Sequence, residues 1–108
     1  MTTSMPLPIV AYFAADGHDG GAVAECFTDD ATVKDEGKTY TGHADISDWK
    51  ANSSRKFAYT VAPFAIENAD GRVVVTAKVA GNFPGSPIDL RYLFAVEGSK
   101  IASLEIKS

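Results

Sequence analysis

The sequence of 108 residues is poor in the features that mark several large classes of protein. Its one cysteine, Cys26, cannot form an intramolecular disulfide, so no disulfide framework stabilises the fold, and this favours a reducing compartment. No apolar run approaches the roughly 18 residues of a membrane-spanning helix. The first residues lack the basic and apolar regions of a signal peptide. We therefore expect a cytoplasmic protein that has no membrane partner.

Positive charge and metal-binding side chains are scarce as well. Ten lysines and arginines stand against fourteen aspartates and glutamates, and the basic residues are scattered rather than gathered into a patch that could neutralise phosphates. The two histidines lie far apart in the sequence, which gives no support for a zinc site. Neither of the glycine-rich strings that bind nucleotide phosphates is present. We expect no metal, no cofactor and no nucleic-acid partner.

The length and the ordinary apolar content of 45% fit a single domain over residues 1–108, with residues 1–7 as a flexible N-terminal tail. The first half of the chain has helical patterns, and the second half alternates apolar and polar residues as strands do. Tight-turn strings separate the later strands, so these strands are expected to be antiparallel. This order predicts an α+β fold in which helices pack on one face of a curved sheet. Helices are expected at about 8–15, 21–27 and 43–53, and strands at about 31–34, 38–41, 56–68, 72–83, 88–97 and 100–106.

Two local strings carry a resemblance to a known family. The first runs Phe-Thr-Asp-Asp-Ala-Thr-Val-Lys-Asp from Phe27 to Asp35 and is followed by Tyr-Thr-Gly-His-Ala-Asp-Ile from Tyr40 to Ile46; the second is Pro-Ile-Asp-Leu-Arg-Tyr from Pro87 to Tyr92. Together with the order of elements, they make the chain from Pro8 to Ile106 similar to the nuclear-transport-factor-2-like superfamily, which includes ketosteroid isomerases and SnoaL-like polyketide cyclases. The resemblance implies a cone: a strongly bent antiparallel sheet, of the cystatin-like α+β barrel type, wraps the N-terminal helices and leaves an apolar pocket at its open end.

The resemblance also implies a catalytic site. Tyr12 and Asp89 would donate hydrogen bonds to a developing enolate oxygen, and Asp35 would move the proton as the catalytic base. Two ordinary interpretations compete with these roles: Tyr12 as an aromatic core residue, and Asp35 as a solvated turn residue. The residues expected to form the walls and the polar end of the substrate pocket are Phe13, Tyr40, Trp49 and Arg91.

The strand at 88–97 leaves the position of Asp89 open. Read without the family, its apolar face meets the core, and Asp89 and Arg91 face solvent. The resemblance instead puts Asp89 in the pocket and leaves the apolar set on the convex face, where it would favour a homodimer through the sheet. An Arg91 guanidinium beside Asp89 favours the carboxylate, which cannot donate a hydrogen bond, and this argues against strict ketosteroid isomerase chemistry. The apolar set consists of Ile88, Leu90, Tyr92, Phe94 and Val96.

Two functions from different classes follow. The first is a pocket protein that acts as a cofactor-free isomerase, cyclase or hydratase, by proton transfer on a small, largely apolar carbonyl compound. The second is a non-catalytic ligand-binding or dimeric interaction module on the same scaffold. Convergence of Tyr12, Asp35 and Asp89 in one pocket favours catalysis, whereas solvent exposure of Asp89 and Arg91 favours the second function.

Overall fold

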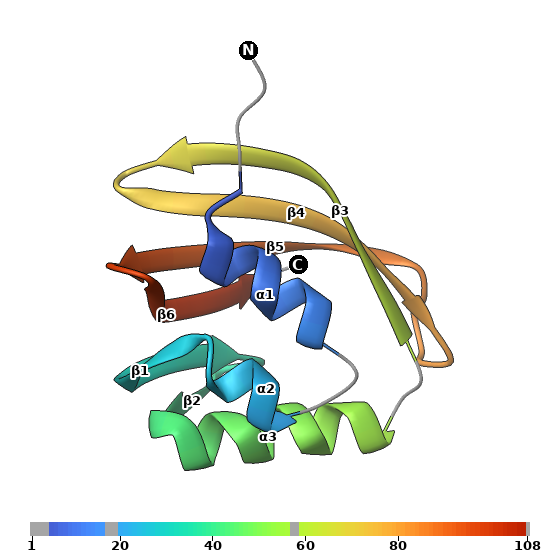
Figure 1. Cartoon of the computed structure of the whole chain (residues 1–108). Coiled ribbons are helices and arrows are strands. Elements are labelled where there is room, and N and C mark those ends of the chain that lie inside the picture. Colours follow the sequence, from blue (N-terminus) through green and yellow to red (C-terminus); the bar gives the residue numbers. More distant parts are fainter. Residues whose placement is uncertain (1–4, 17–19, 57–58, 108) are drawn as a thin grey trace.

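The computed structural model describes residues 5–16, 20–56 and 59–107. In these residues three helices and six strands form an α+β fold (Figure 1), as the sequence predicts. The helices are α1 (Leu7–Ala15), α2 (Gly20–Ala24) and α3 (Gly42–Lys56), and the strands are β1 (Phe27–Asp35), β2 (Lys38–Thr41), β3 (Tyr59–Ala69), β4 (Arg72–Gly81), β5 (Ile88–Glu97) and β6 (Lys100–Lys107).

The six strands belong to one sheet, in the order β2-β1-β6-β5-β4-β3. The sheet is curved, and the helices lie against one of its faces (Figure 1), so the predicted curved sheet with N-terminal helices is confirmed. One pair corrects the expectation of a wholly antiparallel sheet, because β1 and β6 are parallel. The tight-turn argument applies only to strands that follow each other in the chain, and most of the chain separates these two. In the described residues the edge strands β2 and β3 do not pair, so the sheet stays open and is not a closed barrel.

Tight turns determine where several strands end. Asp70 and Gly71 join β3 to β4 with positive φ angles of 53° and 76°, and Glu36 and Gly37 join β1 to β2 with φ angles of 52° and 77°. Two successive positive φ angles are typical of the type I′ turn, whose twist matches that of the strands it joins. Asp-Gly is a preferred pair for this turn, whereas a glutamate seldom adopts a positive φ. The β3–β4 hairpin is therefore the better marked of the two in the sequence.

The start of β1 differs from the prediction. The second helix ends at Ala24 rather than at Phe27, and the strand begins at Phe27 rather than at Ala31. Phe27 pairs with Ile101 of β6, and the Ile101 amide donates a hydrogen bond to the Cys26 carbonyl at 2.8 Å. Pairing with a distant strand thus overrides the local helical pattern.

The N-terminal segment leads directly into α1. Of the predicted flexible tail at 1–7, residues 1–4 lie outside the described residues. Met5 packs against the core, and Leu7 already belongs to the helix. Pro8 lies in the first turn of α1, where a proline has no intrahelical hydrogen bond to lose. Of the described tail residues, Leu7 is therefore the first residue of this helix and Pro6 its N-cap.

The apolar face of β5 meets the helices. Tyr92 and Phe94 are buried, and the Tyr12 ring of α1 lies 5.5 Å from the Phe94 ring between centroids. Asp89 and Arg91 are exposed on the opposite face of the strand. The prediction that placed Asp89 and Arg91 in the pocket is wrong, because turning them inward would desolvate two charges and expose apolar side chains to water. The interpretation from alternation alone is confirmed from Ile88 to Phe94, whereas Val96, which follows a register irregularity between Ala95 and Val96, is exposed.

The homodimer was expected because the apolar side chains of β5 would lie on the convex face of the sheet. With the observed register these side chains, except Val96, face the core instead. The outer face of β5 carries Asp89 and Arg91 together with the partly buried Leu93 and Ala95. A surface that mixes charged and apolar side chains in this way is ordinary for a monomer. Homodimer formation through the sheet stays a prediction, but an exposed apolar face of β5 no longer supports it.

One apolar core lies between the helices and the sheet. Ile9 and Tyr12 are buried three residues apart on α1, and Ile46 and Trp49 are buried with the same spacing on α3. Residues three apart lie on one side of a helix, so each helix turns one face inward. The strand residues buried in the same core are Phe27, Ala31, Val33, Val75, Ala77, Tyr92, Phe94, Ile101 and Leu104.

We expect Ile9→Ala to lower the free energy of unfolding by about 2–5 kcal/mol, because it removes a fully buried side chain and leaves a cavity. Leu7→Ala is the matched control on the same helix. Leu7 is 82% exposed, so its truncation should change the free energy by less than about 0.5 kcal/mol. Urea denaturation followed by circular dichroism measures both. Equal effects of the two substitutions would contradict this packing of α1.

Candidate functional site

A cavity of about 750 Å³ lies between α3, the β1–β2 hairpin and strands β3 to β6. Its lining is mixed rather than apolar, and β5 contributes side chains of both kinds. The polar and aromatic side chains, from the C-cap of α1, from α3, the hairpin, β3 and β5, are Asp16, Asp35, Glu36, Lys38, Tyr40, Trp49, Lys50, Asn52, Tyr59 and Tyr92. The apolar side chains come from β4 to β6 and the β4–β5 loop, and they are Val79, Phe83, Pro84, Ile88, Leu90 and Ile106.

Asp35 ends β1 at this cavity and is half-buried. Its Oδ2 accepts a hydrogen bond of 3.0 Å from the indole Nε1–H of Trp49 on α3. The buried Trp49 ring lies 6.0 Å from the Tyr40 ring of β2, at a tilt of 35°. Within the described residues, Asp35 Oδ1 has no hydrogen bond. The indole therefore holds the carboxylate through one oxygen, and the other has no partner among residues 5–16, 20–56 and 59–107.

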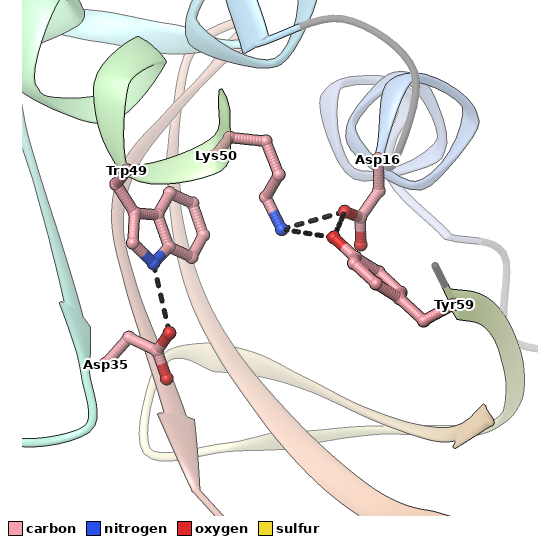
Figure 2. A network of polar contacts seen from close by, with 5 residues as sticks. All are labelled: Asp16, Asp35, Trp49, Lys50 and Tyr59. Atoms are coloured by element: carbon pink, nitrogen blue, oxygen red, sulfur yellow. Dashed lines mark hydrogen bonds and ion pairs between the residues drawn. The ribbon is translucent and has the colours of Figure 1, made fainter. Parts of the chain in front are cut away.

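A second polar cluster joins α1, α3 and β3 (Figure 2). Lys50 Nζ donates to Asp16 Oδ1 at 2.7 Å, and the Tyr59 hydroxyl donates to the same oxygen at 2.9 Å. The Lys50 and Asp16 side chains are only 6% and 1% exposed. The Lys50 ammonium also lies over aromatic rings, 4.3 Å from the Trp49 centroid and 5.6 Å from the Tyr12 centroid. A buried ion pair and one tyrosine hydroxyl therefore link the end of α1, α3 and the start of β3.

Two tyrosines near this cluster have perturbed hydroxyl groups. Burial raises the pKa of Tyr12 well above its usual value, and the Asp16 carboxylate adds to the shift. Burial raises the pKa of Tyr92 as well, again with a contribution from Asp16. Among the described residues, the Tyr12 hydroxyl and Asp16 Oδ2 are buried without a hydrogen-bond partner. Both hydroxyls stay protonated at neutral pH, but only Tyr92 lines the cavity.

The structure brings together three of the seven predicted site residues. Tyr12 and Phe13 of α1 pack in the aromatic core instead of lining the cavity. Asp89 and Arg91 lie on the outer face of β5. The oxyanion-binding pair that the resemblance implies, Tyr12 with Asp89, is therefore not assembled at the cavity. The predicted residues that do line the cavity are Asp35, Tyr40 and Trp49.

Asp16, Lys50 and Tyr59 were missed in the sequence. Helical spacing marks two of them, because Lys50 follows the buried Ile46 by four residues and Asp16 follows the buried Tyr12 by four. Lys50 therefore belongs to the inward face of α3 despite its charge, and Asp16, the C-cap residue of α1, continues the inward face of that helix by one residue. Tyr59 begins a strand, and no local pattern distinguishes it.

The described residues include no obvious metal centre and no activated thiol. Within the ranges 5–16, 20–56 and 59–107, no group of three or more His, Cys, Asp and Glu side chains could hold a metal ion. Cys26 is free and buried, and burial raises the pKa of its thiol, which disfavours the reactive thiolate. In the same ranges no helix is both long and apolar enough to cross a membrane.

Solved structures provide close relatives of this chain, whereas no family model and no curated protein matches it. A candidate polyketide cyclase from Sinorhizobium meliloti is 36% identical, with a TM-score of 0.89 and 95% of each chain covered. A hypothetical protein with a ketosteroid isomerase-like fold from Catenulispora acidiphila, in complex with trimethylamine, is 26% identical, with a TM-score of 0.85 over 97% of this chain and 87% of that one. An NTF2-like protein of unknown function from Cytophaga hutchinsonii shares the fold at 16% identity, with a TM-score of 0.69 over 99% and 93% of the two chains.

We expect Asp16→Ala to lower the free energy of unfolding by about 3–5 kcal/mol, because it leaves the Lys50 ammonium buried without its counter-charge. Asp48→Ala on the exposed side of α3 is the control and should not lower the free energy of unfolding. Chemical denaturation measures both variants. A loss below about 1 kcal/mol for Asp16→Ala would show that the pair is solvated in solution.

The raised pKa values of Tyr12 and Tyr92 make stability depend on pH. The folded state holds these protons more tightly than the unfolded chain does, so their contribution is present below the ordinary tyrosine pKa of about 10 and is lost as the pH rises above it. Ultraviolet titration should show both residues ionising only with alkaline unfolding. Tyr12→Phe should then lower the absorbance change of the alkaline unfolding step by the amount of one tyrosine and leave the titration of the folded protein unchanged. A smaller absorbance change during titration of the folded protein would refute the burial of this hydroxyl.

Proposed function

The chain belongs to the nuclear-transport-factor-2-like superfamily, and we propose that its cavity binds a small carbonyl compound and transfers a proton on it without a cofactor. The observation that carries the proposal is the Asp35 carboxylate at the cavity, held through one oxygen by Trp49 and unbonded, among the described residues, at the other. The 36% identical relative from Sinorhizobium meliloti supports this class of substrate, because a polyketide is a chain rich in carbonyl groups.

Asp35 is the proton acceptor in this proposal. A carboxylate can remove a proton from the carbon next to a carbonyl group when it is oriented and close to that carbon. The Trp49 hydrogen bond supplies the orientation, since it restrains the carboxylate while leaving Oδ1 for the proton. Returning the proton to another carbon gives an isomerisation. Alternatively, attack of the carbanion on a second carbonyl carbon closes a ring, and the proton on Asp35 passes to the alkoxide oxygen that this attack forms.

The enolate oxygen that forms in this step needs a hydrogen-bond donor. Tyr92 supports this role, because it lines the same cavity and its raised pKa keeps the hydroxyl protonated. It takes the place of the Tyr12 and Asp89 pair that the resemblance implies. The donor thus comes from the inner face of β5, the strand that also carries Asp89 on its outer face.

The two-sided lining supports an amphiphilic ligand. Ile88, Leu90 and Val79 offer an apolar wall for a ring or hydrocarbon body, while Asp35 and Tyr92 offer the polar contacts. A cavity of about 750 Å³ suits a ligand of ordinary small-molecule size. We therefore propose a compound with an apolar body and at least one carbonyl group.

A second candidate function is ligand binding without catalysis. It is favoured by the outward position of Asp89 and Arg91 and by the enclosed Tyr12 hydroxyl, which together leave the cavity without the expected pair of acid donors. In that case the same cavity would hold a compound of the same shape, and Asp35 would act only as a hydrogen-bond acceptor.

The first function predicts that the protein speeds deuterium exchange at the carbons next to the carbonyl of 2-tetralone in heavy water, and isomerises a β,γ-unsaturated ketosteroid. Asp35→Asn should lower both rates by at least about 100-fold, because an amide cannot take the proton. Asp89→Asn is the matched control and should leave both rates unchanged, since Asp89 lies outside the cavity. Nuclear magnetic resonance and ultraviolet absorbance measure the two reactions.

Trp49 is the only tryptophan and lines the cavity, so its fluorescence reports ligand binding separately from turnover. Binding of both probes with neither exchange nor isomerisation would reject proton transfer in favour of the second candidate. Equal rates for Asp35→Asn and the wild type would remove Asp35 as the base.

A further inference from the structure

The buried ion pair in the cavity wall is not explained by stability alone. Lys50 and Asp16 are almost fully buried and 2.7 Å apart, yet taking two charges out of water costs about as much as their attraction returns. Apolar side chains of similar volume could hold α1 and α3 together equally well. What distinguishes the pair from an apolar contact is the position of its ammonium group.

That ammonium lies on the face of the Trp49 indole. Nζ is 4.3 Å from the ring centroid of Trp49, closer than to the centroids of Tyr12 at 5.6 Å and Tyr59 at 5.9 Å. A cation is attracted to the negative face of an indole, and the attraction is stronger where water is excluded. Asp16 and Tyr59 accept hydrogen bonds from the Lys50 ammonium and hold it in place. The ammonium therefore restricts the rotation of the indole on which it lies.

The edge of the same indole meets Asp35. Figure 2 shows Lys50 on one side of Trp49 and Asp35 at its N–H, so the ring connects a cation from the second cluster to the carboxylate at the cavity. A cation over the ring draws electron density away from the N–H group and makes it a better hydrogen-bond donor. Lys50, Trp49 and Asp35 thus form a continuous chain of contacts.

We propose that Lys50 is a positioning residue: its ammonium, held by Asp16, fixes the Trp49 indole and thereby the Asp35 carboxylate in the orientation that takes a proton from the ligand. The inference rests on the proposed function for its consequence in turnover. The contact between Lys50 and Trp49 can be tested without turnover.

The first test uses the single indole N–H signal of the protein in a proton–nitrogen nuclear magnetic resonance spectrum. Lys50→Met alone leaves Asp16 buried and unpaired, so the decisive variant is Asp16→Leu with Lys50→Met, which replaces the pair by apolar side chains. Its Trp49 signal should move upfield toward that of Asp35→Ala, in which the acceptor is absent. Lys50→Arg should stay near the wild type, because the cation remains. A folded double variant with the wild-type signal would overturn the proposal.

The second test measures exchange of 2-tetralone. The double variant should lower kcat by about tenfold with little change in KM, because binding surfaces persist while the base is misaligned. In a Trp49→Phe background the same replacement should have no further effect, since the N–H that transmits it is absent. An equal loss in that background would overturn transmission through Trp49. Lys34→Met, an exposed lysine on β1, is the control and should change neither readout.

Failure of the two ideas is distinguishable. A wild-type protein that binds 2-tetralone but exchanges no protons rejects the proposed function, and the indole signal then still decides whether Lys50 positions Trp49. An active wild type whose double variant keeps both kcat and the indole signal rejects the role of Lys50 and leaves the role of Asp35 intact.

Discussion

The packing of the apolar face of β5 under α1 decides which side chains can reach the cavity. Tyr92 and Phe94 turn inward with Ile88 and Leu90, and a shift of one residue would exchange this whole set for the charged one. The inward face then serves two purposes, because Phe94 completes the aromatic core and Tyr92 reaches both the core and the cavity. The helices, the cavity and its polar side chains all lie on this side of the sheet.

Features that depend on neighbours in the chain were predictable. The bounds of β5 and the hairpin partner at Lys38–Thr41 agree with the structure, because alternation and turn residues act within a few positions. The start of β1 was not predictable in this way, since it is set by pairing with Ile101 at the other end of the chain. The parallel pair of β1 and β6 has the same origin.

The residues of the candidate site show the same difference between what local sequence predicts and what tertiary packing decides. Asp35 and Tyr40 lie within the string that carries the resemblance, and Trp49 follows its end by three residues, so a short stretch of sequence was enough to bring the three together. Asp89 failed because a matching string does not specify which face of a strand it presents, and the burial of β5 does. Lys50 lies on the inward face of α3 and Asp16 caps the C-terminus of α1, but a lone charge at such positions is usually solvated, and only the meeting of α1 with α3 brings the two together as a pair.

The open sheet described above gives α3 a particular status. The helix follows the edge strand β2 and precedes the other edge strand β3 in the chain, and its side chains line the cavity between them. Closure here depends on side chains of one helix rather than on backbone pairing between strands. Substitutions at the α3 residues that line the cavity, Trp49, Lys50 and Asn52, are therefore expected to reshape the cavity while the hydrogen bonds of the sheet stay in place.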